Sequence, residues 1–89
     1  MVDLENAVFS EHACEQLEFR GIPQEIVTDA IKDPDKVVDT SEGRIVVEKL
    51  ISDQKKSFLI RVFIDVDREP PVIVTAYKTS TVNKYWRQQ

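Results

Sequence analysis

The chain has 89 residues, of which 42% are hydrophobic and 31% are charged, and its formal net charge is −4. This length predicts one domain over residues 1–89, because single domains usually run to about 100–150 residues. The chain has one cysteine and one histidine, which excludes an internal disulfide and leaves too few ligands for a metal cluster, so we expect neither a metal nor a cofactor.

The N-terminus and the apolar segments indicate the compartment. Residues 1–6 have neither the basic start nor the apolar run of a signal peptide. No apolar stretch approaches the roughly 20 residues that a membrane span needs. We therefore expect a cytoplasmic protein that does not interact with membranes.

Charge is divided unevenly along the chain. Residues 1–42 contain eleven acidic and three basic residues, whereas residues 43–89 contain nine basic and five acidic residues. Residues 77–89 contain no acidic residue, and we expect residues 79–89 to form a polar, basic tail. One interpretation is a solvated surface on both halves. The other is an acidic helical side and a basic side, made of sheet and tail, that can meet an anion.

The first third of the chain has the pattern of two helices. Residues 7–9 are consistent with a short first strand. Ser10 is a good N-cap and Gly21 a good C-terminal stop, which together predict a helix over residues 10–20. An apolar stripe at helical spacing predicts a second helix over residues 23–32.

After residue 35 the apolar pattern changes from helical to strand spacing. We expect antiparallel strands near residues 36–40, 44–52, 57–67 and 71–78. The predicted fold class is α+β, with two N-terminal helices packed on an antiparallel sheet of four to five strands, in the order (β)ααββββ.

The hairpin loops predict which side chains lie opposite each other. A four-residue loop at 53–56 places Glu48 opposite Arg61, and any one-residue slip would turn every side chain to the other face. A five-residue loop at 67–71 places Arg61 opposite Tyr77, although a shift of two residues would preserve the faces. We therefore predict a row of Glu48, Arg61 and Tyr77 on the face away from the helices.

Such a row has the groups needed to cleave RNA without a metal. A carboxylate can take the proton of a 2′-hydroxyl, an arginine can stabilise charge on the phosphate, and a third group can protonate the leaving oxygen. The alternative is an ordinary surface pair, because opposite charges across strands are common and contribute only about 0.2–1 kcal/mol.

His12 is a second candidate for the acid. If the strand at residues 7–9 runs parallel to the last strand, His12 would lie near Tyr77 to Ser80, at the C-terminal ends of both strands. It could then act in place of Tyr77. The alternative is an ordinary surface histidine on the first turn of a helix.

Four short segments resemble a small, uncharacterised bacterial domain family over about residues 8–87. They are Phe9-Ser10-Glu11-His12-Ala13, Arg20-Gly21-Ile22-Pro23, Tyr77-Lys78-Thr79-Ser80 and Lys84-Tyr85-Trp86-Arg87. That family is similar in layout to the ribonuclease toxins of the RelE, ParE and BrnT type. The resemblance implies two helices on an antiparallel sheet, possible RNA cleavage and a cognate antitoxin as partner.

On this resemblance, Glu48 would be the base, Arg61 the phosphate clamp, and Tyr77 or His12 the acid. Lys78, Lys84 and Arg87 are expected to form a positive patch beside Arg61, so the expected RNA-binding residues are Lys78, Thr79, Ser80, Lys84 and Arg87. ParE-type proteins share the fold without ribonuclease activity, and fold does not fix function. Two hypotheses follow: an endoribonuclease toxin, or a non-catalytic module with the same fold that binds a protein.

Overall fold

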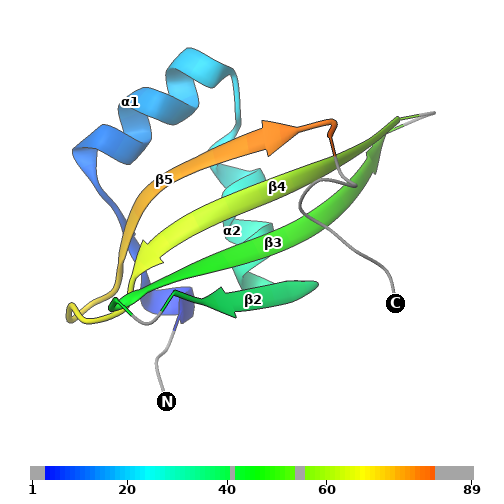
Figure 1. Cartoon of the computed structure of the whole chain (residues 1–89). Helices are drawn as coiled ribbons and strands as arrows, with labels where there is room; N and C mark the ends of the chain where they lie inside the picture. The colour runs from blue at the N-terminus through cyan, green and yellow to red at the C-terminus, as the bar shows by residue number, and fades with distance from the viewer. Residues whose placement is uncertain (1–3, 41, 54–55, 82–89) are drawn as a thin grey trace.

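The computed structural model describes residues 4–40, 42–53 and 56–81 (Figure 1). In chain order its elements are η1 (Leu4–Asn6), β1 (Val8–Phe9), α1 (Glu11–Arg20), α2 (Gln24–Lys32), β2 (Lys36–Asp39), β3 (Arg44–Asp53), β4 (Lys56–Asp65) and β5 (Val72–Thr79). The predicted helices and strands are confirmed to within two residues at each end. The short helix η1 was not expected.

Local capping explains where α1 begins and ends. The Ser10 side chain accepts a hydrogen bond of 3.0 Å from the backbone N–H of Ala13, which satisfies one of the donors that a helix start leaves unpaired. At the other end, Gly21 has φ 67° and ψ 33°, the left-handed conformation that closes a helix. The next helix, α2, follows Pro23 directly.

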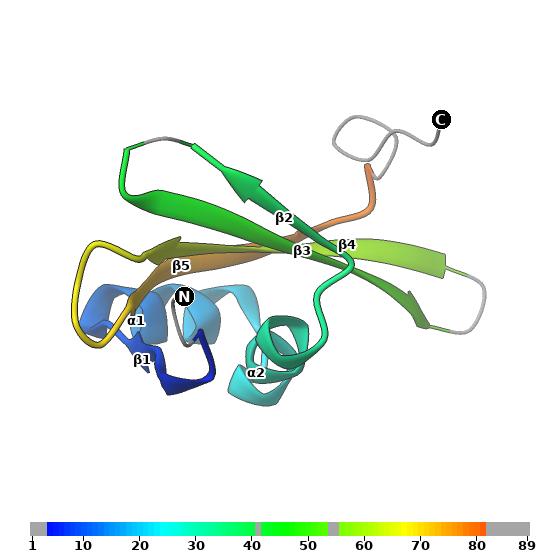
Figure 2. The same cartoon turned by 90° about the horizontal axis from the view of Figure 1, so that it is seen from below.

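The strands form one five-stranded sheet in the order β1-β5-β4-β3-β2, and both helices lie on one face of it (Figure 2). The β2–β3, β3–β4 and β4–β5 pairs are antiparallel, as predicted. Strand β1 is parallel to β5, so the sheet is mixed rather than wholly antiparallel. The chain between β1 and β5 contains both helices and strands β2 to β4, and a connection of that length allows parallel pairing. The α+β class is confirmed.

The β3–β4 register is as predicted, with Glu48 opposite Arg61. Arg61 also lies opposite Tyr77, but the loop before β5 was predicted wrongly. Asp65 rather than Val66 pairs with Val72, so this loop has six residues (66–71) rather than five. A β-bulge next to Phe63 and Ile64 then shifts the register by one residue.

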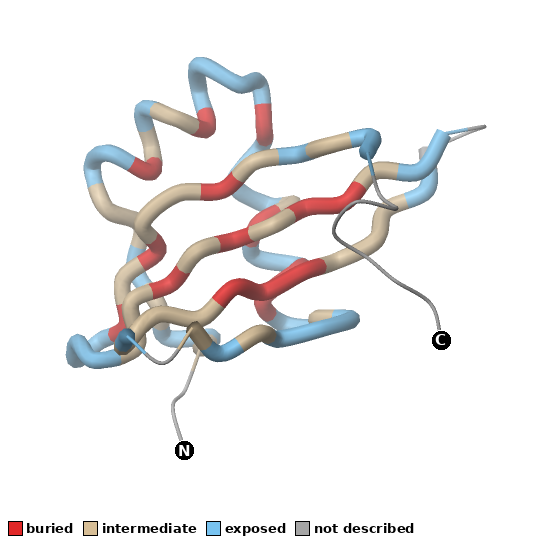
Figure 3. Tube along the Cα trace, viewed as in Figure 1, coloured by how far each residue is buried: buried red, intermediate tan, exposed pale blue. Residues whose placement is uncertain are grey.

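The hydrophobic core lies between the helices and the sheet. Its buried residues are Ala13, Leu17, Ile22, Val27, Ala30, Ile31, Val47, Ile60, Val62, Ile64, Ile73 and Ala76. Figure 3 shows buried residues along the middle of the strands and at intervals along the helices. Strand residues alternate between faces, so the neighbours of these core residues point to the opposite side of the sheet. We call that side the outer face; it carries Val46, Glu48, Leu59, Arg61, Phe63 and Tyr77.

Among the residues that the structure describes, no helix is long and apolar enough to cross a membrane.

Candidate functional site

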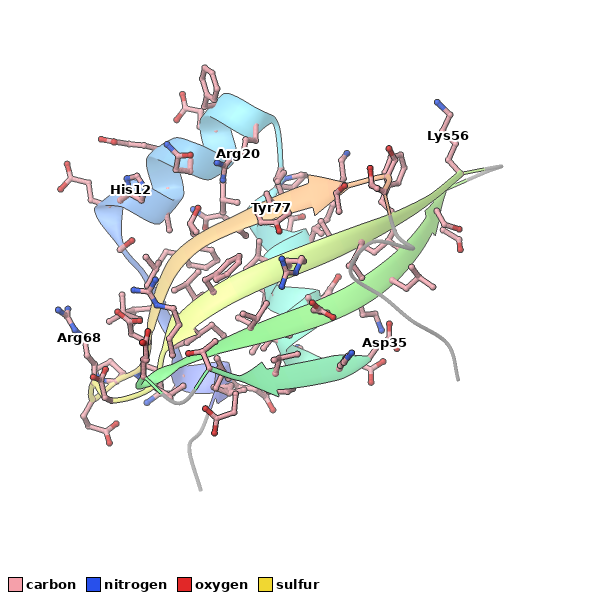
Figure 4. The ribbon with its side chains drawn as sticks, viewed as in Figure 1. His12, Arg20, Asp35, Lys56, Arg68 and Tyr77 are labelled. Carbon is pink, nitrogen blue, oxygen red and sulfur yellow. The ribbon has the colours of Figure 1, made fainter. Side chains whose placement is uncertain are left out.

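Three neighbouring strands bring a carboxylate, a guanidinium and a phenol into contact on the outer face. Arg61 Nε donates to Glu48 Oε2 at 2.8 Å, and Arg61 Nη1 donates to the hydroxyl of Tyr77. Figure 4 shows Tyr77 on this face of the sheet. On β2, Lys36 is the register partner of Glu48, and sequence reasoning missed this residue. The predicted strands near residues 36–40 and 44–52 leave a three-residue loop at 41–43, which would have placed Lys36 opposite Glu48.

Burial sets this ion pair apart from an exposed cross-strand pair. The Glu48 side chain is 2% exposed and the Arg61 side chain 18% exposed. Val46 and Leu59 are buried on the same face. Glu48 Oε1 is buried and has no hydrogen-bond partner among the described residues. A buried acceptor without a hydrogen bond lowers the stability of the fold by about 1–3 kcal/mol. A hydrogen bond from any O–H or N–H donor that reached Oε1 would therefore be favourable.

The guanidinium of Arg61 lies over two aromatic rings. Phe63 and Tyr77 stack with ring centroids 5.9 Å apart and an interplanar angle of 29°. The Arg61 Cζ atom lies 5.4 Å from the Phe63 centroid and 5.6 Å from the Tyr77 centroid. These distances suit cation–π attraction. Hydrogen bonds to Glu48 and Tyr77 and contacts with both rings therefore help to fix Arg61.

The row also keeps Arg61 charged. Burial acts to lower the pKa of Arg61, but its hydrogen bonds with Tyr77 and Glu48 outweigh that effect and raise the pKa above its ordinary value. Arginine is already protonated at any ordinary pH. The guanidinium is thus a permanent cation held between an anion and a phenol.

His12 does not join the row. Strand β1 is parallel to β5, as the His12 hypothesis required, but it pairs with Val72 and Ile73 at the start of β5. His12 is exposed on the first turn of α1, apart from Tyr77 (Figure 4). The expectation that His12 lies near Tyr77 to Ser80 is wrong. Strand β1 has only two residues and pairs with the start of β5, so it does not reach the later half of that strand.

The expected positive patch is also corrected. Lys78 pairs with the core residue Ile60 and points to the helix side of the sheet, where its Nζ lies 4.8 Å from the Phe58 ring centroid. Tyr77 and Lys78 are adjacent in a strand, so they face opposite sides. Thr79 does lie on the outer face, opposite Leu59, and Ser80 is exposed. Lys84 and Arg87 lie outside the described residues.

Within residues 4–40, 42–53 and 56–81, no group of three or more His, Cys, Asp or Glu side chains is placed to hold a metal ion.

The fold and the row together define a small two-helix α+β domain with a charged and aromatic site on the outer face of its sheet. A family model described as "Domain of unknown function (DUF4258)" matches residues 9–78, and the chain belongs to this family. The match includes the segments around His12 and Arg20 and ends within the segment that begins at Tyr77. No curated protein and no solved structure gives a significant match.

Proposed function

We propose that this protein is a cytosolic, metal-independent endoribonuclease, comparable to the RelE- and BrnT-type toxins and controlled by an antitoxin protein. The observation that carries the proposal is the contiguous row of Glu48, Arg61 and Tyr77, in which one carboxylate oxygen is still unpaired within the described chain. A base, a cation and a hydroxyl acid in direct contact are the groups that this reaction needs.

Each residue of the row has a role in the proposed reaction. Glu48 Oε1 accepts the proton of a substrate 2′-hydroxyl, and the resulting oxygen attacks the adjacent phosphorus. Arg61 stabilises the negative charge that grows on the phosphate oxygens. Tyr77 donates its hydroxyl proton to the departing 5′-oxygen. The bond between phosphorus and that oxygen breaks, which leaves a 2′,3′-cyclic phosphate and a 5′-hydroxyl.

The burial of Glu48 favours a second candidate function. With its carboxylate 2% exposed, the row must open before a substrate can reach Oε1. In a non-catalytic module, the same pair would only hold β3 to β4 while another surface of the domain binds a partner protein.

The two candidates differ in their response to conservative substitutions. We expect the purified chain, in EDTA and free of any partner, to cleave single-stranded RNA to products with a 2′,3′-cyclic phosphate end. Glu48→Gln and Tyr77→Phe should each lower the rate by about 10²–10⁴, the usual loss for one positioned acid or base. Asp65→Asn, which alters an ion pair elsewhere in the same sheet, is the matched control and should leave the rate unchanged.

Intact RNA after incubation with the folded chain would contradict the endoribonuclease proposal. Equal rates for Glu48→Gln, Tyr77→Phe and the unsubstituted chain would contradict the assigned roles even if cleavage occurred. In cells, an active chain should arrest bacterial growth, and Glu48→Gln should relieve the arrest. Growth arrest that persists with Glu48→Gln would favour the protein-binding function.

A further inference from the structure

The bulge in β5 decides the face on which Tyr77 lies. Val72 and Ile73 pair with Asp65 and Ile64, while Thr75 pairs with Phe63, so Val74 is an extra residue without a partner on β4. If the first register continued without a bulge, Tyr77 would lie opposite Ile60. That position faces the helices, because side chains on directly paired residues share a face.

The core residues on β5 confirm this effect of the bulge. Ile73 and Ala76 both face the helices, with exposures of 1% and 0%. They are three positions apart, whereas a regular strand returns to the same face after two. One extra residue before Ala76 therefore moves Tyr77 to the outer face, where it meets Arg61.

Arg20 binds the two residues that follow the bulge. Its Nη1 donates to the carbonyl oxygen of Ala76 at 2.8 Å and to Thr75 Oγ1 at 3.1 Å. Figure 4 shows Arg20 between the end of α1 and β5. Gly21, in its left-handed conformation, ends α1 directly after Arg20, and Ile22 is buried in the core. The side chain of Arg20 is therefore fixed by its hydrogen bonds to β5, and its backbone by the turn that ends α1.

Strand β1 forms hydrogen bonds along the edge of β5 that does not pair with β4, and Arg20 continues this row. The carbonyl of Pro71 accepts from Val8, that of Ile73 accepts from Ser10, and that of Ala76 accepts from Arg20. The carbonyls are two and then three residues apart, and the longer interval contains the bulge. A side chain takes over from the backbone at the point where the strand becomes irregular.

We infer that Arg20 is a positioning residue, which stabilises the β5 bulge and so keeps Tyr77 on the outer face in contact with Arg61. Its importance for RNA cleavage rests on the proposed function, but its effect on Tyr77 does not. Bulges bend a strand and re-aim its side chains, and they are frequent next to active sites. Here the arginine at the end of α1 and the bulge act together on one side chain.

The test measures where the Tyr77 ring lies, without any assay of activity. The Phe63 and Tyr77 rings stack at 5.9 Å, so their protons should give a nuclear Overhauser cross-peak in the folded protein. In a Tyr85→Phe background, Tyr77 is the only tyrosine and its ring signals are unambiguous. We expect Arg20→Met to abolish the cross-peak, while the methyl signals of Val47 and Val62 keep their positions.

Two further variants separate position from charge. Arg20→Lys retains a cationic donor for Thr75 and Ala76, and should restore the cross-peak. Arg44→Met removes a guanidinium that bonds Asp65 on β4 at 2.6 Å, rather than Thr75 or Ala76 on β5, and should leave the cross-peak intact. If the Arg20→Met chain keeps the cross-peak, or if Arg44→Met loses it equally, the inference is wrong.

If the Arg20→Met chain fails to fold, a second variant tests the inference. Thr75→Val removes one acceptor of Arg20 with little change in shape, and should shift the Tyr77 ring signals. Unchanged signals would overturn the inference. Should RNA cleavage be found, Arg20→Met should also slow it about as much as Tyr77→Phe does, by about 10²–10⁴-fold. A lost cross-peak in a chain without activity would support the inference and contradict only the proposed function.

Discussion

Burial distinguishes the Glu48–Arg61 pair from the Arg44–Asp65 and Lys49–Asp33 pairs. The Arg44 side chain of the Arg44–Asp65 pair is 42% exposed, and the Asp33 side chain of the Lys49–Asp33 pair is 89% exposed. Exposed pairs contribute about 0–1 kcal/mol, because water and salt screen them. A buried pair costs desolvation on both sides, so each partner depends on the other. Removal of one residue therefore has a different effect from removal of both.

At the scale of single residues, we predict that Arg61→Met lowers the free energy of unfolding by about 3–5 kcal/mol, because it leaves the buried Glu48 carboxylate uncompensated. The double variant Glu48→Leu, Arg61→Met should recover most of that loss. Urea denaturation followed by circular dichroism measures both. The raised pKa of Arg61 means that its contribution is present throughout the ordinary pH range and is lost only as the pH rises through that raised value. A double variant as unstable as Arg61→Met would show that the pair is not coupled.

At the scale of elements, the turn between β2 and β3 depends on Gly43. Its φ is +75°, and an added Cβ would lie 2.7 Å from Asp67 Oδ2 in the loop after β4. The Gly43 carbonyl also accepts from the backbone N–H of Val66 at 2.9 Å, so the two loops are tied together. Gly21 has a similar φ of +67°, but an added Cβ there would meet nothing within 4 Å.

We therefore expect Gly43→Ala to destabilise the fold more than Gly21→Ala does. Gly21→Ala should cost about 1–2 kcal/mol, the strain of a left-handed residue that has a Cβ. Gly43→Ala should cost that amount and a further contribution from the contact with Asp67. Asp67→Ala should remove the further contribution when combined with Gly43→Ala. Thermal denaturation of Gly21→Ala, Gly43→Ala, Asp67→Ala and the double variant Gly43→Ala, Asp67→Ala measures these differences. Equal losses for Gly21→Ala and Gly43→Ala would show that the contact with Asp67 contributes nothing.

How much the sequence predicts also depends on the element. The Glu48–Arg61 register followed from the alternation of apolar residues and a short loop, both of which are local signals. The Arg61–Tyr77 register was right only because two errors compensated: the loop was one residue too short, and the bulge was missed. Val72, Ile73 and Val74 are all β-branched and apolar, so nothing in their pattern marks the extra residue.

Long-range contacts account for the other errors. The position of His12 depends on how far β1 extends along β5, and a two-residue strand gives no periodicity from which to predict this. The patch around Lys78 was inferred from charge along the chain, which takes no account of the face that each strand residue occupies. The unpaired oxygen of Glu48 was also beyond sequence reasoning, because burial is a property of the assembled sheet.

At the scale of the whole molecule, the acidic residues of the helices lie away from the outer face of the sheet. The exposed sides of the helices carry Glu11, Glu15, Glu18, Glu25 and Asp29. On the outer face, Arg61 and Tyr77 lie beside Glu48, and Lys36 is the next residue of the same row. A net charge of −4 is therefore compatible with an anion on the outer face, since the charges on the helix layer lie across the core from it.

The last prediction uses this separation to identify the class of ligand. We expect the Glu48→Gln variant, which should bind RNA without cleaving it, to lose affinity for single-stranded RNA linearly in log salt. The slope should be about 0.7 per phosphate contact, because each contact releases condensed counterions.

The double variant Glu15→Gln, Glu18→Gln changes two residues of the helix layer, on the other side of the sheet. It should leave the slope unchanged, since these residues make no phosphate contact. Arg61→Gln should reduce the slope by the share of one contact. Affinity that is independent of salt, measured by fluorescence anisotropy of labelled RNA, would exclude phosphate recognition and favour a protein partner instead.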